Sequence, residues 1–202
     1  MDRERSIAVI AMKGHPGSGK STLATAIAKS LKCPLIDKDH FRDSTHAVQQ
    51  ALLPQTPRAA AAKLLNDLSY EAMWRVASTQ LDLGLSVVVD SPLSRRAHLD
   101  RLLDMSGGRV MVVECRPGDE AEWRRRLESR GETEWHKPST WGEMEQLLEG
   151  YGGCWDYDMA DVPNLVFDTT APLQIADLAS RVIEFVNSDQ CFFRTTLHEA
   201  TV

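Results

Sequence analysis

Five short apolar segments, rich in β-branched residues, recur along the chain and predict buried β-strands. Their hydrophobic positions are nearly continuous, which is typical of strands covered on both faces. The second segment is the weakest of them, because Pro34 limits its early pairing. The predicted strands are residues 6–12, 33–37, 85–90, 109–114 and 165–168.

Segments with helical spacing of apolar residues separate these runs. The longest begins at Pro57, a residue favoured in the first turn of a helix, and ends before Gly84. The predicted helices are residues 20–32, 57–83, 94–105, 119–129 and 172–186. Strands that alternate with helices in this way predict a parallel α/β sheet with right-handed crossovers.

The chain shows no internal repeat, low-complexity tract or shift of composition, so we expect one domain over residues 1–187. Two segments without regular period, 131–140 and 150–161, lie between the fourth and fifth predicted strands. Residues 188–202 have little periodicity, and we expect a C-terminal tail there that is flexible or loosely docked.

Composition is that of an ordinary globular protein, with 43% hydrophobic and 26% charged residues. No apolar run approaches the ~20 residues of a membrane helix. The charged start, residues 1–5, leaves no room for a signal or transit peptide before the first strand. The cysteines are far apart and form no C-x-x-C pair, which favours free thiols in a reducing compartment. We therefore expect a cytoplasmic protein that does not bind membranes.

Charge also bears on the partners of the protein. The formal net charge is −6, which argues against a general nucleic-acid partner but leaves a local basic cleft open. The six histidines are scattered without the spacing of metal ligands, so no zinc site is expected.

The segment between the first predicted strand and the first predicted helix carries the most specific motif, G-x-x-x-x-G-K-[ST]. Successive N–H groups of such a loop form an anion site, and the following helix adds its positive N-terminal dipole. Lys20 can reach the β- and γ-phosphates, and Ser21 supplies a hydroxyl to Mg²⁺. The predicted nucleotide-binding residues are Gly14, His15, Pro16, Gly17, Ser18, Gly19, Lys20, Ser21 and Thr22. We call residues 14–21 the phosphate loop.

The context of the phosphate loop favours a nucleotide site over a chance match, which would arise in about one chain of this length in a hundred. The loop lies between an apolar strand and a helix, as the motif requires. Pro16 is expected to stiffen the turn, and His15 to be a bystander rather than a catalytic group. No N-K-x-D motif for guanine occurs, so ATP is the expected nucleotide.

Three aspartates follow predicted strands, at the edge where open α/β sheets bind ligands. Asp90 ends the run VVVD and is predicted to hold Mg²⁺, with helix capping as the alternative. A kinase that acts on a hydroxyl needs a carboxylate near that oxygen to accept its proton. Asp39 is the candidate base, with Asp37 as its competitor and a helix N-cap as the alternative role. Arg42, one helical turn on, could hold an anionic or polar acceptor.

Arginines on the helix predicted over 119–129 and just after it could close over ATP. Arg126 and Arg130 are four residues apart and share a face. There they could neutralise charge on the transferred phosphoryl group, whereas a solvated helix with Glu122 and Glu128 is the rival interpretation. We expect a lid over about 119–140. The aromatic residues after it either pack under loops or form an acceptor wall: Trp141, Tyr151, Trp155 and Tyr157.

These motifs, in this order, resemble the small P-loop kinases of the AAA_33 group, which includes zeta-toxin-like, chloramphenicol-phosphotransferase-like, gluconate-kinase-like and polynucleotide-kinase-like domains. The matching pieces span about residues 6–170 and are GHPGSGKST, Asp39-x-x-Arg42, VVVDSP, and VVECRP leading into Arg126-x-x-x-Arg130. The resemblance implies a three-layer α/β sandwich whose five-stranded parallel sheet has the order 2-3-1-4-5. It also implies Mg-ATP as donor, Asp39 as base, and adenine against the loop that contains Thr170.

The expected function is transfer of the γ-phosphate of ATP to a hydroxyl of a small-molecule acceptor. Lys20, Mg²⁺, Arg126 and Arg130 would stabilise charge, and Asp39 would accept the proton. One alternative is a kinase for polynucleotide 5′-hydroxyls, which needs a basic track to Asp39. Another is a nucleotide-dependent switch or ATPase that acts through a protein partner. The sequence predicts neither the identity of the acceptor nor the oligomeric state.

Overall fold

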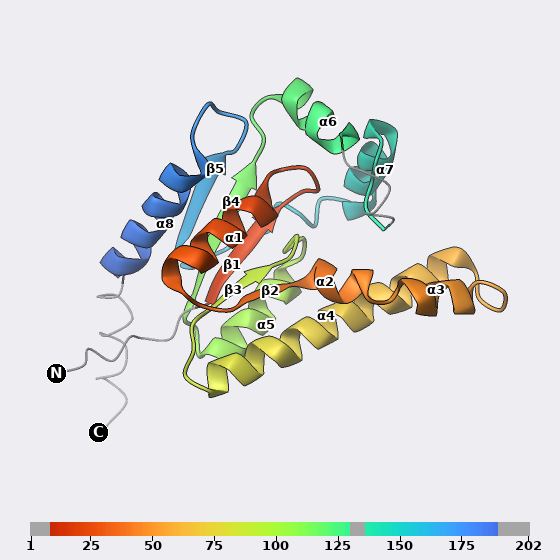
Figure 1. Ribbon diagram of the computed structural model, residues 1–202, viewed down its shortest axis with the longest axis horizontal. Coiled ribbons are helices and arrows are strands. Elements are labelled where there is room, and N and C mark those ends of the chain that lie inside the picture. The colour runs from red at the N-terminus through yellow and green to blue at the C-terminus, as the bar shows by residue number, and fades with distance from the viewer. Residues whose placement is uncertain (1–8, 130–135, 190–202) are drawn as a thin grey trace.

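The structure, a computed structural model, describes residues 9–129 and 136–189. In this part of the chain, five parallel strands form one sheet in the order β2-β3-β1-β4-β5 (Figure 1). The strands are β1 (Val9–Gly14), β2 (Leu35–Asp37), β3 (Val87–Asp90), β4 (Val110–Arg116) and β5 (Asn164–Asp168). The predicted fold class and strand order are therefore confirmed.

Helices connect these strands and cover both faces of the sheet (Figure 1). They are α1 (Lys20–Leu31), α2 (Lys38–Asp43), α3 (His46–Leu52), α4 (Arg58–Asp82), α5 (Arg96–Ser106), α6 (Glu120–Glu128), α7 (Trp141–Tyr151) and α8 (Ile175–Asp189). Of these eight helices of the described residues, five were predicted within a few residues, whereas α2, α3 and α7 were not. No helix in the described ranges is both long and apolar enough to cross a membrane.

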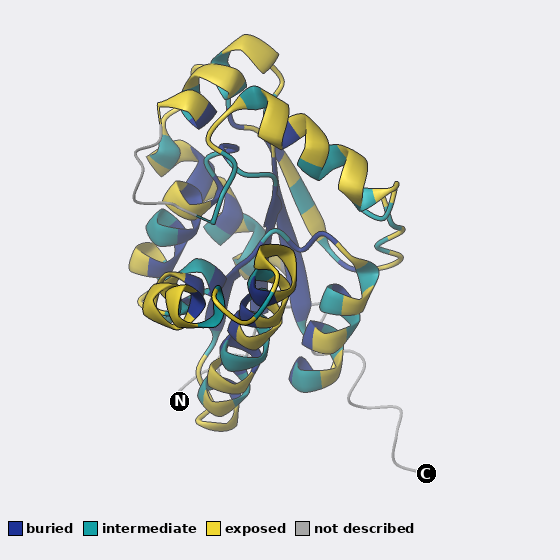
Figure 2. Ribbon diagram, turned by 90° about the vertical axis from the view of Figure 1, so that its right-hand side faces the viewer, coloured by how far each residue is buried: buried dark blue, intermediate teal, exposed yellow. Residues whose placement is uncertain are grey.

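The sheet separates two apolar layers, because alternate residues of a strand point to opposite faces. Val9 and Ala11 of β1 pack in the layer formed with α4 and α5, and Ile10 and Met12 pack in the layer with α1 and α8. Figure 2 shows the central strands in dark blue between helices whose outer faces are yellow. Burial of each aliphatic side chain contributes about 1.5–3 kcal/mol to the stability of the folded state. The two apolar layers therefore hold the strand ends in fixed positions.

The carboxyl ends of the strands meet at one edge of the sheet, where the phosphate loop joins β1 to α1. The parallel register pairs Asp90 with both Met12 and Asp37 at this edge. Gly17 and Gly19 have φ angles of 79°, a left-handed conformation that residues with a Cβ adopt only under strain. Helices α6 and α7 lie beyond the same edge (Figure 1). The fold therefore brings sequence-distant polar residues around the loop.

Three of the four cysteines lie in the described residues, and all three are free thiols: Cys33, Cys115 and Cys154. Cys191 lies outside the described residues, as do Arg130 and most of the predicted C-terminal tail. Helix α8 extends to Asp189 and so includes the first two residues of that tail.

Candidate functional site

A cavity of about 860 Å³ opens at the carboxyl edge of the sheet. All nine predicted nucleotide-binding residues from Gly14 to Thr22 line it, and so do Asp37, Asp39 and Arg42. Helix α4, the start of α5, residues 136–138 and α7 supply its other walls. One cavity therefore contains the phosphate loop and the acidic turn after β2, which the sequence analysis treated as separate motifs.

Lys20 and Asp90 form a buried ion pair beneath the phosphate loop. The ammonium group of Lys20 donates to Asp90 Oδ1, and Asp90 is fully buried. Burial favours a lower pKa for Lys20, but the charge of Asp90 outweighs it and raises the pKa. Lys20 is therefore charged, as binding of phosphate requires. Asp90 does not cap a helix, which was the alternative considered for it, because α5 begins beyond it, at Arg96.

The protein groups near Lys20 fit Mg²⁺ that binds together with a nucleotide. Asp90 Oδ2 is buried and has no hydrogen-bond partner among the described residues, and Ser21 is exposed at the start of α1. No group of three or more His, Cys, Asp or Glu in the described ranges could hold a metal ion. Mg²⁺ in nucleotide sites commonly takes one or two protein oxygens and completes its shell with phosphates and water. Ser21 and Asp90 match that pattern.

Asp37 and Asp39 have different surroundings. Asp37 is the N-cap of α2, since its Oδ1 accepts a hydrogen bond from the Asp39 backbone N at 2.8 Å. The capping role considered for Asp39 thus belongs to Asp37. Burial and the nearby Asp90 raise the pKa of Asp37. Because Asp37 caps α2, the Asp39 carboxylate does not bind the backbone of this helix, and Asp39 lines the cavity.

The Asp39 carboxylate is bound by two ammonium groups. Lys38 Nζ lies 2.8 Å from Oδ1, and Lys137 Nζ lies 3.0 Å from Oδ2. Burial alone would raise the pKa of Asp39, but the two lysines outweigh burial and hold the pKa below its ordinary range. Asp39 is therefore ionised, and it links α2 to the segment that precedes α7.

Arg42 lines the cavity but is also part of the local structure. Its guanidinium donates to Thr45 Oγ1 at 2.7 Å and to Gln49 Oε1 at 2.6 Å, and the residue is 3% exposed. Burial lowers its pKa. These bonds join α2 to α3, so the predicted contact between Arg42 and the acceptor stays a prediction.

The end of the predicted lid contacts α2 through an ion pair and a hydrogen bond. Besides the bond from Lys137 to Asp39, His136 Nε2 lies 2.8 Å from Asp43 Oδ1. The two basic residues are consecutive, and so they hold the chain before α7 across the mouth of the cavity. Arg130, predicted to be catalytic, lies in the part of the lid outside the described residues.

Helix α6 packs directly on the phosphate loop. Trp123 Nε1 donates to the Pro16 carbonyl at 2.8 Å, and a Cβ on Gly17 would lie 3.1 Å from the Trp123 ring. Arg126 donates to the Thr169 carbonyl at 2.9 Å and to Glu122 at 2.7 Å. The rival interpretation paired Arg126 with Glu122 on a solvated helix, and this pair is present. Arg126 also contacts the loop after β5, and its guanidinium lies close to Gly19.

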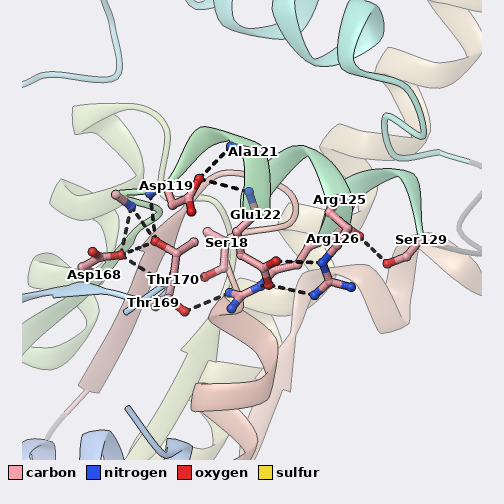
Figure 3. Close-up of polar contacts among 11 residues, drawn as sticks. Ser18, Asp119, Ala121, Glu122, Arg125, Arg126, Ser129, Asp168, Thr169 and Thr170 are labelled. Carbon is pink, nitrogen blue, oxygen red and sulfur yellow. Dashed lines mark hydrogen bonds and ion pairs between the residues drawn. The ribbon is translucent and has the colours of Figure 1, made fainter. Parts of the chain in front are cut away.

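Thr169 and Thr170 tie the loop after β5 to its neighbours (Figure 3). Thr169 Oγ1 donates to the Ser18 carbonyl at 2.6 Å. Thr170 Oγ1 accepts hydrogen bonds from the backbone N of Gly118 and of Asp119, at 3.0 and 2.9 Å. The Thr170 side chain is thus engaged in the turn that leads into α6, and its backbone N donates to Asp168 Oδ1 at 2.9 Å, so the predicted contact with adenine stays a prediction.

His15 is packed in an aromatic cluster. Its ring stacks on Trp155 at a centroid distance of 3.6 Å, and the rings of Trp123 and Tyr151 both lie at 5.8 Å. Burial, and then the charge of Lys13, lower its pKa to about 4. His15 is therefore neutral near pH 7 and holds the phosphate loop against the segment after α7. Of the four aromatic residues predicted to pack or to form a wall, Tyr151 lines the cavity.

A buried ion pair near the aromatic cluster was not predicted. Lys13 of β1 and Glu114 of β4 are register partners, with their charged atoms 2.9 Å apart. Arg116 binds the same Glu114 oxygen at 2.7 Å, and Lys13 Nζ lies 4.1 Å from the centroid of the Trp155 ring. These residues are brought together by the strand register, so no local sequence motif predicts the ion pair.

The acceptor side of the cavity also contains residues that sequence analysis missed. Asn66 and Tyr70 come from α4, and Arg95 and His98 come from the start of α5. We call Asp39 and these four residues the acceptor end of the cavity. The position of Arg95 shortly after Asp90 and β3 was the one available signal, because that segment follows a strand end.

Comparison with known proteins gives a family and a fold. A family model described as an AAA domain, AAA_33, matches residues 9–150. No curated protein matches the chain significantly in sequence. Among solved structures, a presumed kinase from Chloroflexus aurantiacus superposes with a TM-score of 0.67 at 22% identity, over 91% of this chain and 98% of the other.

Two further solved structures have the same fold. A gluconokinase from Sinorhizobium meliloti superposes with a TM-score of 0.61 at 20% identity, over 95% of this chain and 99% of the other. The APS kinase of Mycobacterium tuberculosis, in complex with AMPPNP and APS, gives 0.54 at 18% identity, over 90% and 98%. At these identities the likeness shows the α/β fold of P-loop kinases and leaves the substrate open.

Proposed function

The chain belongs to the AAA_33 family of AAA domains and has the fold of P-loop kinases, and on that premise we propose that it transfers the γ-phosphate of Mg-ATP to a hydroxyl of a small molecule. The observation that carries the proposal is the single cavity lined by both the phosphate loop and Asp39. A binding module or switch would need the loop, but it would not need an ionised carboxylate in the same cavity.

The phosphate loop is the donor side of the proposed reaction. Its backbone N–H groups and the start of α1 bind the β- and γ-phosphates, and Lys20 exchanges its bond with Asp90 for phosphate oxygens. Ser21 and Asp90 would hold Mg²⁺, which, when bound, neutralises phosphate charge. Arg126, beside Gly19 and the loop after β5, would contact the nucleotide. Arg130 stays part of the proposal as a second lid arginine.

Asp39 is the group that would act on the acceptor. It hydrogen-bonds the acceptor hydroxyl, orients that oxygen toward the γ-phosphorus, and receives the hydroxyl proton as the new O–P bond forms and the bond to ADP breaks. A carboxylate of low pKa is a weak base. This property suits phosphoryl transfer with a loose transition state, in which positioning and charge stabilisation supply most of the catalysis.

The test is a screen of hydroxyl compounds with Mg-ATP, with ADP release and phosphorylated products both followed by mass spectrometry. Asp39→Asn should lower kcat by about 10²–10⁴-fold and leave the Kd of ATP within a few-fold, because a general base contributes about that much. Asp104→Asn, a change of the same kind on the outer part of α5, is the matched control and should keep full activity. ADP release that survives Asp39→Asn intact would refute the mechanism.

A further inference from the structure

Four residues that line this end of the cavity form a row: Lys38, Tyr70, His98 and Arg95. Lys38, which is 7% exposed, lies beside Asp39, with its Nζ 5.5 Å from the centroid of the Tyr70 ring. The Tyr70 ring lies 4.4 Å from the ring of His98, and the backbone N of His98 donates to the carbonyl of Arg95, the N-cap of α5, at 3.0 Å. The row thus has a cation at each end and aromatic rings between them.

Two acidic residues around this row are paired with lysines: Asp39 with Lys38 and Lys137, and Asp67 with Lys63. Asp43 contacts His136, whose pKa is lowered by burial. In contrast, the guanidinium of Arg95 makes no ion pair with any carboxylate of residues 9–129 and 136–189. The adjacent Arg96 is bound to Asp100 at 2.7 Å and to the Asp158 carbonyl at 2.6 Å, and it lies outside the cavity. Arg95 therefore lines the cavity with a guanidinium that forms no ion pair with a carboxylate of the described residues.

The rings between the two cations are uncharged. Burial, and then Arg95 and Lys38, lower the pKa of His98 to about 4, while burial raises the pKa of Tyr70. The imidazole and the phenol can therefore contact a polar molecule without cancelling the charge of Arg95. Asn66, whose Oδ1 lies 3.5 Å from Lys38 Nζ, adds a neutral hydrogen-bonding group to the same wall.

We propose that the phosphate acceptor carries an anionic group in addition to its hydroxyl, and that Arg95 binds this group while Tyr70 and His98 form the floor under the rest of the molecule. The anion is a carboxylate, a phosphate or a sulfate. This proposal rests on the proposed function and names the substrate class of that site. With the hydroxyl at Asp39, the anion at Arg95 stands at the far end of the row from the negative charge of Asp39.

The physical reason is the cost of an unmatched charge. A guanidinium pairs with carboxylate and phosphate oxygens through two parallel hydrogen bonds, and such charge-assisted bonds are about twice as strong as neutral ones. A neutral acceptor would cover Arg95 and remove water from it without giving it a partner, which costs binding free energy. The site therefore favours anionic acceptors, because Arg95 attracts them. It disfavours neutral analogues, because they remove water from Arg95 without pairing with it.

Matched acceptor pairs test this inference. Glycerate with glycerol, glucuronate with glucose, and glucose 6-phosphate with glucose differ by one anionic group and are compared for phosphoryl transfer from Mg-ATP. The anionic member should be the better acceptor, and Arg95→Gln should raise its KM at least tenfold with the KM of ATP unchanged. Arg96→Gln, the neighbouring control, should change neither value by more than about twofold, and Arg95→Lys should recover part of the loss.

A second measurement does not depend on turnover. The protein loaded with Mg-AMPPNP, which fills the phosphate loop, is titrated with malonate, inorganic phosphate and sulfate by calorimetry. Binding that Arg95→Gln abolishes and Arg96→Gln retains supports the anion site, and the strongest of the three ligands identifies the anion. Thermal unfolding of each variant checks that the folded state is intact, as expected for an exposed residue at a helix start.

The two measurements separate the two proposals. Transfer to neutral acceptors, with no anion binding that depends on Arg95, would overturn the anion site and leave the phosphotransferase. Anion binding through Arg95 without transfer to any hydroxyl compound would overturn the phosphotransferase and leave the anion site. Equal KM values for wild type and Arg95→Gln with an anionic acceptor would also overturn the inference.

Discussion

Asp39 is the residue on which the proposed chemistry depends, and each of its carboxylate oxygens is bound by an ammonium group. The two lysines have a cost and a benefit for catalysis. They weaken Asp39 as a base, yet they keep it ionised in acid and bring positive charge next to the position of the transferred phosphoryl group.

Removing one of these ammonium groups should shift the pH dependence of the reaction. Lys137→Met leaves Asp39 with a single ammonium partner, so the pKa of Asp39 rises toward its ordinary value. Since activity requires the ionised carboxylate, the acid limb of kcat/KM should move to higher pH, and the pH–rate profile measures this shift. Lys29→Met, on the exposed side of α1, should not move the limb, and an unmoved limb in Lys137→Met would disprove the coupling.

Two partly buried histidines, His15 and His98, should make the fold less stable in mild acid. His15 and His98 each have a pKa of about 4 in the folded protein, against 6.5 for an ordinary histidine. Above pH 6.5 both are neutral in the folded and the unfolded chain and contribute nothing. Between pH 6.5 and 4 only the unfolded chain takes up their protons, so the free energy of unfolding falls as the pH falls.

Urea unfolding at pH 7 and at pH 4.5 measures this loss. His98→Gln should reduce it by about 1–2 kcal/mol, a figure already lowered for the partial exposure of the ring, and His15→Gln should act in the same direction. His40→Gln, on the exposed side of α2, is the control and should leave the loss unchanged. A loss of equal size in the wild type, in His15→Gln and in His98→Gln would show that other groups cause it.

At the level of elements, the turn between β4 and α6 is closely packed against the end of β5. The Gly118 backbone N donates to Asp168 Oδ1 at 2.9 Å, and a Cβ on Gly118 would lie 2.8 Å from Asp168 Cγ. The bond from Thr170 lowers the pKa of Asp168 to about 2, so this carboxylate is a permanent charged acceptor for the turn. This turn between β4 and α6 also determines where α6 lies on the phosphate loop.

Alanine at two glycines should therefore have opposite effects. Gly118→Ala forces the turn away from Asp168 and should lower the free energy of unfolding by about 1–3 kcal/mol. Gly142→Ala, in the first turn of α7 with open space around it, should raise that free energy by about 0.5–1 kcal/mol. Chemical denaturation of the two variants measures both changes. Destabilisation by Gly142→Ala, or none by Gly118→Ala, would contradict this description of the packing.

Elements differ in how far the sequence predicts them. The strands were found because two-sided burial demands continuous apolar runs, and α1 and α4 because they are long and well delimited. Helices α2 and α3 have six and seven residues, too few for a helical period to be seen. Helix α7 lies mostly between the two segments without regular period and was left unassigned, although the capping box of Thr140 and Glu143 was a usable signal.

The candidate site likewise contains residues that the sequence predicts and residues that it does not. The phosphate loop is a local motif, so its residues could be named from the sequence. The partners of Asp39 could not, because Lys137 reaches it across a long stretch of chain, and neither could the bond from Trp123 to Pro16. Arg95 was missed because an arginine without an acidic partner is recognised only when the surrounding side chains are in place.

For the molecule as a whole, charge separates a small-molecule kinase from a polynucleotide kinase. The formal net charge is −6, and the lysines that line the cavity are paired with carboxylates: Lys20, Lys38, Lys63 and Lys137. A track for a nucleic-acid strand needs a series of unpaired cations. The charge distribution therefore favours a small acceptor with one anionic group over an extended polyanion.

An oligonucleotide with a 5′-hydroxyl provides the corresponding measurement. We expect binding to the Mg-AMPPNP-loaded protein no tighter than ~10⁻⁴ M at ~0.15 M salt, the weak end of non-specific binding, because few phosphates would be neutralised. Fluorescence anisotropy across a salt series gives both the affinity and its slope. Tight binding that weakens steeply with salt would favour the polynucleotide alternative.

The most direct measurement of the central claim, phosphoryl transfer that depends on Asp39, follows the fate of the γ-phosphate in a single turnover. ATP labelled at the γ-position is bound to excess protein with Mg²⁺, and the best acceptor from the screen is added. In the wild type the label should move to the acceptor, and in Asp39→Asn it should remain in bound ATP, at least 100-fold slower to transfer. Label released as inorganic phosphate, at a rate that neither the acceptor nor Asp39→Asn changes, would contradict the account and indicate an ATPase or switch.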